Sequence, residues 1–425
     1  MLDLKKIREQ PDRYRDGLRK RRLSPRPIDD ILETDRRRRA LLAEIEKLRA
    51  DQNRASAEIP KLKGAGREQR IAETRALAER VKSLEPGVEA VEAELDALLQ
   101  ALPNHPDDGV PDGADDSENT IVRTWGVPPS FDFPALDHVD IGARLGILDF
   151  ERGARASGSR FFYLRGDGVL LEMALVRFAL DILTREGFTP LSTPMIVRSN
   201  VITGAWGGAA LDSQQTYKIE DEDLALIGTS EQSVAAFHMD EVLDAATLPL
   251  RYAGLSYCFR REAGSYGRDT RGLYRVHQFY KVEMFSYCRP ERSSDEHEYL
   301  VGLEERFVRA LGLPHRVALL CGGALGQGMA KTYDIETWMP GRDAYGETHS
   351  CSSAGDFQAR RLGIRSRGGA RGPAEFVHTL NGTLVATSRA LIAVLENGQQ
   401  SDGRVRLPDA LVPYMGGRTE LRPPS

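Results

Sequence analysis

Apolar residues follow a coiled-coil pattern between Leu77 and Leu102. The steps between them alternate between four and three residues, at Leu77, Val81, Leu84, Val88, Val91, Leu95, Leu98 and Leu102. This spacing is typical of the seam of a two-stranded coiled coil. A shorter seam precedes it at Leu41, Ile45 and Leu48, and the helix-breaking residues Pro60, Gly64 and Gly66 lie between the two seams. The pattern therefore predicts an antiparallel helical hairpin over about residues 28–102.

The composition changes after this hairpin. Residues 104–120 are rich in Pro, Gly and Asp and show no apolar period. We therefore expect a linker there, between a helical domain at residues 1–103 and a second domain at residues 121–425.

The second domain mixes helical and strand patterns. Gly168–Gly187 has helical apolar spacing, and Thr189–Val197 is expected to form a strand that Pro194 interrupts. Arg251–Glu262 and Leu273–Tyr287 predict two more strands, and the loop between them is rich in Gly and Arg. Such a loop between strands is suited to facing phosphates.

The bulk properties exclude a membrane protein and a disulfide scaffold. The 425 residues are 28% charged and contain no run of 18 or so apolar residues, so we expect a cytoplasmic protein with no membrane segment. The cysteines lack CxxC spacing and clustered histidine partners, which predicts reduced thiols rather than disulfides or a zinc site; they are Cys258, Cys288, Cys321 and Cys351.

The net charge of −5 is unevenly distributed. Between Arg36 and Lys82 there are 14 Lys and Arg residues against 7 Asp and Glu residues. A protruding rod with this charge could bind a phosphate backbone, because Lys and Arg displace its counterions. A solvated helix face would carry similar charges, and composition does not separate the two interpretations.

Three stretches of the second domain carry a family resemblance. CFRREAGSYGRDTRGLYRVHQFYKVE, FQARR and HTLNGT…SRALIAVLEN resemble the seryl branch of the class II aminoacyl-tRNA synthetases, and the resemblance extends over essentially the whole chain. It implies an α+β fold, with an antiparallel sheet flanked by helices and an N-terminal coiled-coil hairpin. It also implies a homodimer that uses ATP to activate L-serine as seryl-adenylate and transfers it to the 3′ end of tRNA(Ser).

The resemblance implies an ATP site built around two catalytic arginines, Arg260 and Arg389. Arginine suits this chemistry because its planar fork can hold carboxylate and phosphate together while charge builds up at phosphorus. The implied ATP-binding residues are Arg260, Arg261, Glu262, Val276, Phe279, Glu347, Thr348, His349, Ser350 and Arg389. Glu347 and Ser350 are the implied Mg²⁺ ligands, and hard oxygen donors suit that ion.

The resemblance also implies residues for the other two substrates. The implied serine-binding residues are Thr229, Ser230, Glu231, Arg260, Glu283, Asn381 and Thr383. The implied tRNA-binding residues are Arg36, Arg39, Arg49, Arg54, Lys61, Lys63 and Arg75 in the hairpin, and Arg268 and Arg271 in the Gly- and Arg-rich loop. Trp206 and Trp338 are interpreted as packing residues, and His277 and His378 as core histidines.

Several positions depart from the family pattern; they are Gln232, Ser233, Ala324, Gly346, His349 and Ser388. These departures spare the charged site residues, so they favour a divergent copy over a decayed catalyst. A specialised synthetase, for antibiotic self-resistance or for a biosynthetic supply of seryl-tRNA, is one alternative. An amino acid:carrier-protein ligase would lack the hairpin, and a non-catalytic RNA-binding paralogue would have lost charged site residues.

Overall fold

The computed structural model describes residues 1–207, 215–263, 271–369 and 372–424. The chain forms two compact units. One contains Leu2–Arg19 and Leu23–Leu102, and the other contains Met1, Lys20–Arg22 and Pro103–Ser425. No helix in the described ranges is both long enough and apolar enough to cross a bilayer.

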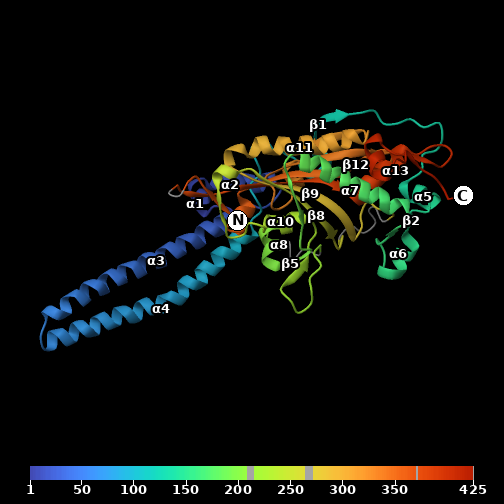
Figure 1. Cartoon of the computed structure of the whole chain (residues 1–425). Helices are drawn as coiled ribbons and strands as arrows, with labels where there is room; N and C mark the ends of the chain where they lie inside the picture. Colours follow the sequence, from blue (N-terminus) through green and yellow to red (C-terminus); the bar gives the residue numbers. More distant parts are fainter. Residues whose placement is uncertain (208–214, 264–270, 370–371, 425) are drawn as a thin grey trace. The chain divides into compact units, whose positions relative to one another are not determined.

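The first unit is the predicted helical hairpin (Figure 1, blue). After the short helices α1 (Leu4–Glu9) and α2 (Pro11–Lys20), the chain forms the long helices α3 (Arg26–Glu58) and α4 (Ala65–Ala101). A 3-10 turn at Ile59–Lys61 and the positive φ of Gly64 (60°) reverse the chain between them. The seam residues Val81, Val91 and Leu95 are buried, which confirms the coiled-coil pattern.

The second unit is built on an eight-stranded sheet. Its strands are β1 (Thr120–Trp125), β10 (His315–Leu319), β11 (Lys331–Met339), β12 (Ala344–Gly355), β15 (His378–Ala386), β9 (Gln278–Cys288), β8 (Leu250–Phe259) and β4 (Thr189–Ser192), in that spatial order. Neighbouring strands are antiparallel except β4 and β8, which are parallel. The expected antiparallel sheet is therefore present.

Three helices pack on one face of this sheet. They are α7 (Asp167–Arg185), α11 (Ser293–Ala310) and α13 (Thr387–Gly398), and Figure 1 shows them running along the sheet. Leu175, Val301 and Leu391 of these helices are buried in the main apolar core. The expected helix at Gly168–Gly187 is confirmed as α7.

Shorter elements surround the sheet. The helices are α5 (His138–Arg144), α6 (Phe150–Ser157), α8 (Ser199–Trp206), α10 (Ser230–Ala235) and α12 (Phe357–Arg361). The strands are β2 (Leu148–Asp149), β3 (Tyr163–Leu164), β5 (Ile196–Arg198), β6 (Leu224–Leu226), β7 (Val242–Asp244), β13 (Arg365–Arg367), β14 (Ala374–Phe376), β16 (Val405–Arg406) and β17 (Glu420–Leu421).

Three expected strands are shorter than predicted. The stretch Thr189–Val197 is divided between β4 and β5 around Pro194, and β8 ends at Phe259. Glu262 has a φ of 48°, which a strand cannot accommodate, so the chain leaves the sheet before it. The following strand β9 starts only at Gln278; before it, Leu273 is buried in the core, and Tyr274 and Val276 line the candidate site.

The stretch expected to be a linker packs onto the second unit. The Asn104 side chain is buried and donates to the carbonyls of Gly328 (3.0 Å) and Ala354 (2.8 Å). Val110 is buried against Leu320 and Leu325. The stretch expected to be a linker therefore belongs to the second unit, which contains the chain from Pro103 onward.

Candidate active site

A polar cleft of about 400 Å³ lies on the sheet of the second unit. Alternate residues of β9 and β15 line it, among them Lys281, Glu283, Asn381 and Thr383. The residues between them pack in the core with the helices, as Val282 does. Since successive side chains of a strand point to opposite faces, the cleft lies on the face opposite α7, α11 and α13.

Glu283 is a carboxylate of the cleft with three polar partners. It accepts hydrogen bonds from Asn381 Nδ2 (3.0 Å) and Thr383 Oγ1 (3.1 Å), and it forms an ion pair with Lys281 Nζ (2.5 Å). The carboxylate is buried, so these donors compensate for the loss of water around it. The result is a fixed negative charge in the wall of the cleft.

Glu231 provides a second buried carboxylate. It accepts from Trp206 Nε1 (3.0 Å) and Gln358 Nε2 (2.8 Å). Burial, followed by the charge of Glu283, raises the pKa of Glu231 to about 7. Two carboxylates and a lysine in one buried cluster suit a zwitterionic ligand that carries its own ammonium group.

The sequence interpretation missed two residues of this cluster. Trp206 was expected only to pack, yet its indole lines the cleft and holds Glu231. Lys281 had no expected role. A signal for it was present, because Phe279, Lys281 and Glu283 recur at every second position of an otherwise apolar strand and must share one face.

Arg260 lies in the same cleft, beside the aromatic ring of Phe279. Its Nε donates to the Gly228 carbonyl (3.1 Å), and its guanidinium carbon lies 5.4 Å from the centre of the Phe279 ring. Glu262 also lines the cleft and pairs with Arg275 at 3.5 Å. The positive φ of Glu262 is uncommon for a residue other than glycine, and such backbone strain clusters at functional sites.

Arg389 and Glu347 form the main ion pair of the cleft. Arg389 Nη1 lies 2.8 Å from Glu347 Oε1 and also donates to the Glu347 carbonyl (3.0 Å). Burial opposes ionisation of both groups, but the partner charge raises the pKa of Arg389 and lowers that of Glu347. Both side chains are therefore charged.

A β-bulge directs Glu347 into the cleft. Along β12, Ser350 and Ser352 face the cleft, while Cys351 faces the helices. Strict alternation would place Glu347 on the helix side. The pairing of β11 with β12 skips Thr348, since Ile335 pairs with His349 and Glu336 with Glu347. One extra residue reverses the facing of Glu347, so it joins Ser350 in the cleft.

Asp334 is a cleft residue for which we predicted no role. It lies across from Ser350 on β11, and its Oδ1 is buried with no hydrogen-bond partner among the described residues. Burial, followed by the charge of Glu347, raises its pKa well above the ordinary range. A carboxyl with a raised pKa can hold a proton, whereas a cation bound beside Glu347 and Ser350 would stabilise its ionised form.

Most of the expected substrate residues line this cleft. They are Thr229, Glu231, Arg260, Glu262, Val276, Phe279, Glu283, Glu347, Thr348, Ser350, Asn381, Thr383 and Arg389.

Three expected residues lie elsewhere. The His349 ring is buried and packs against Phe307 of α11, because it lies on the helix side of β12. The Ser230 hydroxyl donates to the Gly254 carbonyl (3.2 Å) within the core. Arg261 is exposed, and its backbone N–H donates to the Gln215 carbonyl (2.9 Å).

The expected tRNA-binding residues of the hairpin are exposed, and most of them pair with nearby acids. In the hairpin Arg39 pairs with Asp35 (3.0 Å), Arg49 with Glu85 (3.2 Å), and Arg75 with Glu79 (4.0 Å). Further pairs join Arg36 to Glu33 and Arg54 to Asp51. Lys61 and Lys63 lie at the turn of the hairpin and are exposed.

Of the two residues expected to bind tRNA in the Gly- and Arg-rich loop, the structure describes Arg271. Arg271 pairs with Asp137 (2.8 Å) and Asp140 (2.5 Å). Arg268 lies outside the described residues.

The departures from the family pattern also have defined places. Ala324 and Ser388 line the cleft. Gly346 is buried, and a Cβ there would lie 3.0 Å from Met339 Sδ and 3.2 Å from the Tyr274 ring. A larger side chain at 346 would therefore require those neighbours to move.

Comparison with known proteins identifies the family. Residues 1–106 match the seryl-tRNA synthetase N-terminal domain, and residues 216–398 match the tRNA synthetase class II core domain (G, H, P, S and T). The serine–tRNA ligase of Dictyoglomus turgidum is 46% identical over 425 residues, which is 100% of both chains. This chain belongs to the seryl-tRNA synthetase family.

Other relatives in this family agree over the same length. The serine–tRNA ligase of Beutenbergia cavernae is 46% identical over 99% of this chain and 100% of its own. Seryl-tRNA synthetase from Pyrococcus horikoshii, solved as a complex with ATP, superposes with a TM-score of 0.97 at 42% identity over 100% of both chains. The cytoplasmic serine–tRNA ligase of Naegleria fowleri, solved with AMP, gives 0.91 at 34% identity over 100% of this chain and 99% of its own.

Proposed function

We propose that this seryl-tRNA synthetase family member activates L-serine with ATP and transfers the seryl group to the 3′ end of tRNA(Ser). One observation carries the proposal. A single cleft holds the buried carboxylates Glu231 and Glu283 together with the charged residues Arg260, Glu347 and Arg389. The first set suits an amino acid with an ammonium and a hydroxyl group, and the second suits a polyphosphate.

In the activation step, a serine carboxylate oxygen attacks the α-phosphorus of ATP. A new P–O bond forms while the bond from the α-phosphorus to the β-bridging oxygen breaks, and pyrophosphate leaves with that electron pair. Two anions must approach, so fixed cations lower the barrier. Arg260 would bind the carboxylate and the α-phosphate, and Arg389 would bind the leaving polyphosphate.

Serine specificity follows from hydrogen-bonding groups that are already in place. Glu283, held by Asn381 and Thr383, can accept from the serine hydroxyl, and Glu231 can balance the ammonium group. An alanine would leave buried polar groups without partners, which a site of this kind rejects strongly. Threonine would be excluded by the shape of the pocket around its extra methyl group.

The cleft also suits a magnesium ion. Glu347 and Ser350 offer hard oxygen donors, and the unbonded Oδ1 of Asp334 adds a buried carboxylate oxygen beside them. Such donors match the preference of Mg²⁺ for carboxylate oxygen. We propose that Glu347 and Ser350 hold it. When bound, the ion would neutralise phosphate charge.

The second step is transfer to tRNA. A ribose hydroxyl at the 3′ end attacks the carbonyl carbon of seryl-adenylate, an ester forms, and AMP leaves. We propose that the basic hairpin and Arg271 contact the tRNA, since each exposed cation near phosphate releases counterions. Replacing residues 36–82 with a short Gly-Ser turn should preserve adenylate formation and reduce tRNA charging. Unchanged charging would refute this role for the hairpin.

We also propose a cytoplasmic homodimer. Support comes from α7, where Val169, Leu170 and Met173 are each about two-fifths exposed, so three large apolar side chains of one helix face solvent. Such a patch is typical of an interface. Sedimentation equilibrium should give twice the chain mass, and a monomer at micromolar concentration would refute the dimer. The proposed substrates, ATP and tRNA, are consistent with the cytoplasm.

The direct test is amino acid-dependent exchange of pyrophosphate into ATP, followed by charging of total tRNA. Exchange with serine, and with neither alanine nor threonine, is the expected result. Exchange without charging would support a carrier-protein ligase, and no exchange with any amino acid would leave a non-catalytic RNA-binding role.

A further inference from the structure

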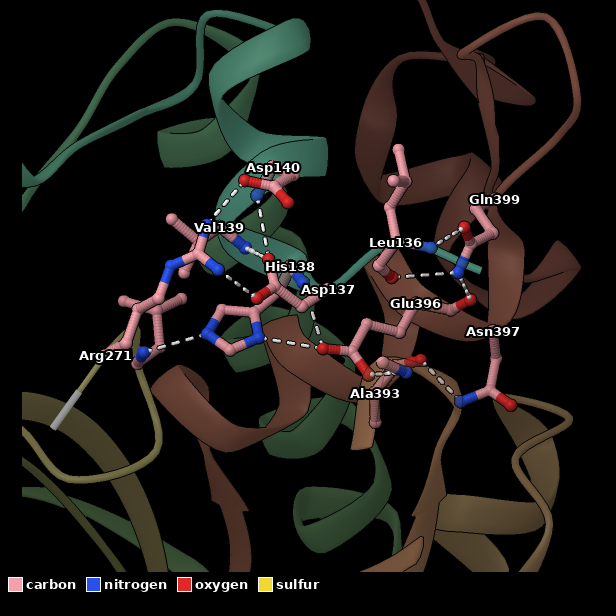
Figure 2. Close-up of polar contacts among 12 residues, drawn as sticks. Leu136, Asp137, His138, Val139, Asp140, Arg271, Ala393, Glu396, Asn397 and Gln399 are labelled. Carbon is pink, nitrogen blue, oxygen red and sulfur yellow. Dashed lines mark hydrogen bonds and ion pairs between the residues drawn. The ribbon is translucent and has the colours of Figure 1, made fainter. Parts of the chain in front are cut away.

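A buried histidine at the start of α5 connects two parts of the second unit. His138 is 6% exposed, and Figure 2 shows its ring between Glu396 and the chain that follows Arg271. Nδ1 lies 2.8 Å from Glu396 Oε1, and Nε2 lies 3.0 Å from the backbone nitrogen of Leu273. A backbone N–H can only donate, so Nε2 accepts. Nδ1 must then carry the ring proton and donate it to Glu396.

Glu396 is anchored at the same point by backbone groups. Its carboxylate is fully buried and accepts from the backbone N–H of His138 (2.9 Å) and of Gly341 (2.9 Å), in addition to the ring. Several N–H donors stabilise a buried carboxylate without a neighbouring cation. The position of Glu396 is therefore fixed on one side by α5 and on the other by the turn at Gly341.

The two elements that His138 connects both reach the cleft. Leu273 precedes Tyr274, whose ring lines the cleft and lies 4.7 Å from the Arg389 guanidinium carbon. Glu396 belongs to α13, which also carries Arg389, seven residues earlier. His138 thus joins the segment that presents Tyr274 to the helix that presents Arg389.

Gly272 supports this connection independently. It has a φ of 89°, and a Cβ there would lie 2.1 Å from His138 Nε2. The backbone therefore lies directly against the ring. Next to it, Arg271 pairs with Asp137 and Asp140, on either side of His138 (Figure 2).

We propose that His138, together with Glu396, is a positioning residue for ATP. It holds Tyr274 and Arg389 at the spacing that lets Arg389 meet the polyphosphate. This rests on the proposed function, because Arg389 is given its role there. The serine-facing residues Glu231 and Glu283 lie on α10 and β9, and the hydrogen bonds described for His138 go to Glu396 and Leu273 instead, so serine binding should be unaffected.

The test separates the two halves of the connection. His138→Asn can still donate toward Glu396 but loses the acceptor for Leu273, and His138→Gln can still accept from Leu273 but loses the donor to Glu396. Each should raise the KM for ATP in pyrophosphate exchange about tenfold, the effect of one lost buried hydrogen bond, with the KM for serine within about twofold of wild type. Gly272→Ala, which displaces the ring, should act in the same direction.

A matched control is His315→Gln. His315 is fully buried, its Nδ1 lies 3.0 Å from the Leu313 carbonyl and its Nε2 lies 3.7 Å from Glu305 Oε1, and none of these three residues lines the cleft. It should lower Tm without changing either KM.

Wild-type exchange with serine is measured first, and its absence would refute the proposed function, not the role of His138. With wild-type exchange present, lowered Tm and an unchanged KM for ATP in the His138 and Gly272 variants would overturn the positioning role. Equal increases in both KM values would also overturn it, because they would indicate general loosening. If the His138 variants fail to fold, Gly272→Ala decides alone.

Discussion

The two faces of the central sheet differ in whether their carboxylates have hydrogen-bond or ion-pair partners. On the cleft face, Glu283 has three partners and Glu347 has Arg389. On the helix face, Glu304 of α11 is buried, and neither of its carboxylate oxygens has a hydrogen-bond partner among the described residues. A carboxylate with fixed partners remains ionised and can act on a ligand, whereas one without partners mainly destabilises the fold.

We expect the largest effect from the loss of the Arg389 guanidinium, which is paired with Glu347 in the cleft. Arg389→Ala should lower kcat/KM for serine-dependent pyrophosphate exchange by about two to three orders of magnitude, as the loss of one fixed charge-stabilising group does elsewhere. Arg389→Lys keeps the charge but loses the planar fork, and should recover only part of the rate. Exchange at the wild-type rate in Arg389→Ala would show that Arg389 does not take part in adenylate formation.

The next effect concerns the carboxylate that selects serine. Glu283→Gln keeps the size of the side chain but removes its charge and leaves Lys281 without its partner at 2.5 Å. The KM for serine should rise about 10- to 100-fold, since a buried polar group left without its partner costs about 1–3 kcal/mol. The KM for ATP should change much less. A larger effect on ATP than on serine would mean that Glu283 does not face the amino acid.

On the helix face of the sheet, removing a buried carboxylate should stabilise the protein. Burial, followed by the charge of Glu283, raises the pKa of Glu304 well above 4.5, so the folded state loses stability as the pH rises above that value. Glu304→Leu removes the unbonded carboxylate and should increase the free energy of unfolding at pH 8 by about 1–3 kcal/mol. Chemical denaturation at pH 5 and pH 8 measures this, and the gain should be smaller at pH 5. A loss of stability at both pH values would show that Glu304 has a partner after all.

A smaller effect is expected from the titration of Glu231. Its pKa is raised to about 7, so below that pH the carboxyl is protonated and cannot balance the serine ammonium group. The kcat/KM for serine should rise with pH up to about 7 and then level off, with a change of about tenfold for each pH unit on the acidic side. In Glu231→Gln this slope should disappear. A slope that persists would belong to another group.

The sequence predicted the helical hairpin and the helix α7 well, because both depend on local apolar spacing. It also placed Glu283, Asn381 and Thr383 together, through their resemblance to a family. It placed His349 wrongly and gave no role to Lys281 and Asp334. Strict alternation along β12 also could not predict that Glu347 faces the cleft, since the bulge at Thr348 reverses its facing. Such a bulge depends on pairing with a strand that lies elsewhere in the sequence.

We expect the smallest effect from an exposed ion pair of the hairpin. In the hairpin, Arg49 lies 3.2 Å from Glu85, and their side chains are 58% and 48% exposed. An exposed pair contributes about 0–1 kcal/mol, so Glu85→Gln should change the free energy of unfolding by less than about 1 kcal/mol. Glu85→Gln should also free Arg49 to bind phosphate, and tRNA affinity should then rise slightly at low salt.

Arg49→Gln should have as little effect on stability, but it should weaken tRNA binding and reduce its dependence on salt concentration, because one fewer cation displaces counterions. Filter binding between about 50 and 200 mM salt distinguishes the two variants. Equal affinities would mean that the pair is a solvated helix face, as the charge pattern alone allowed.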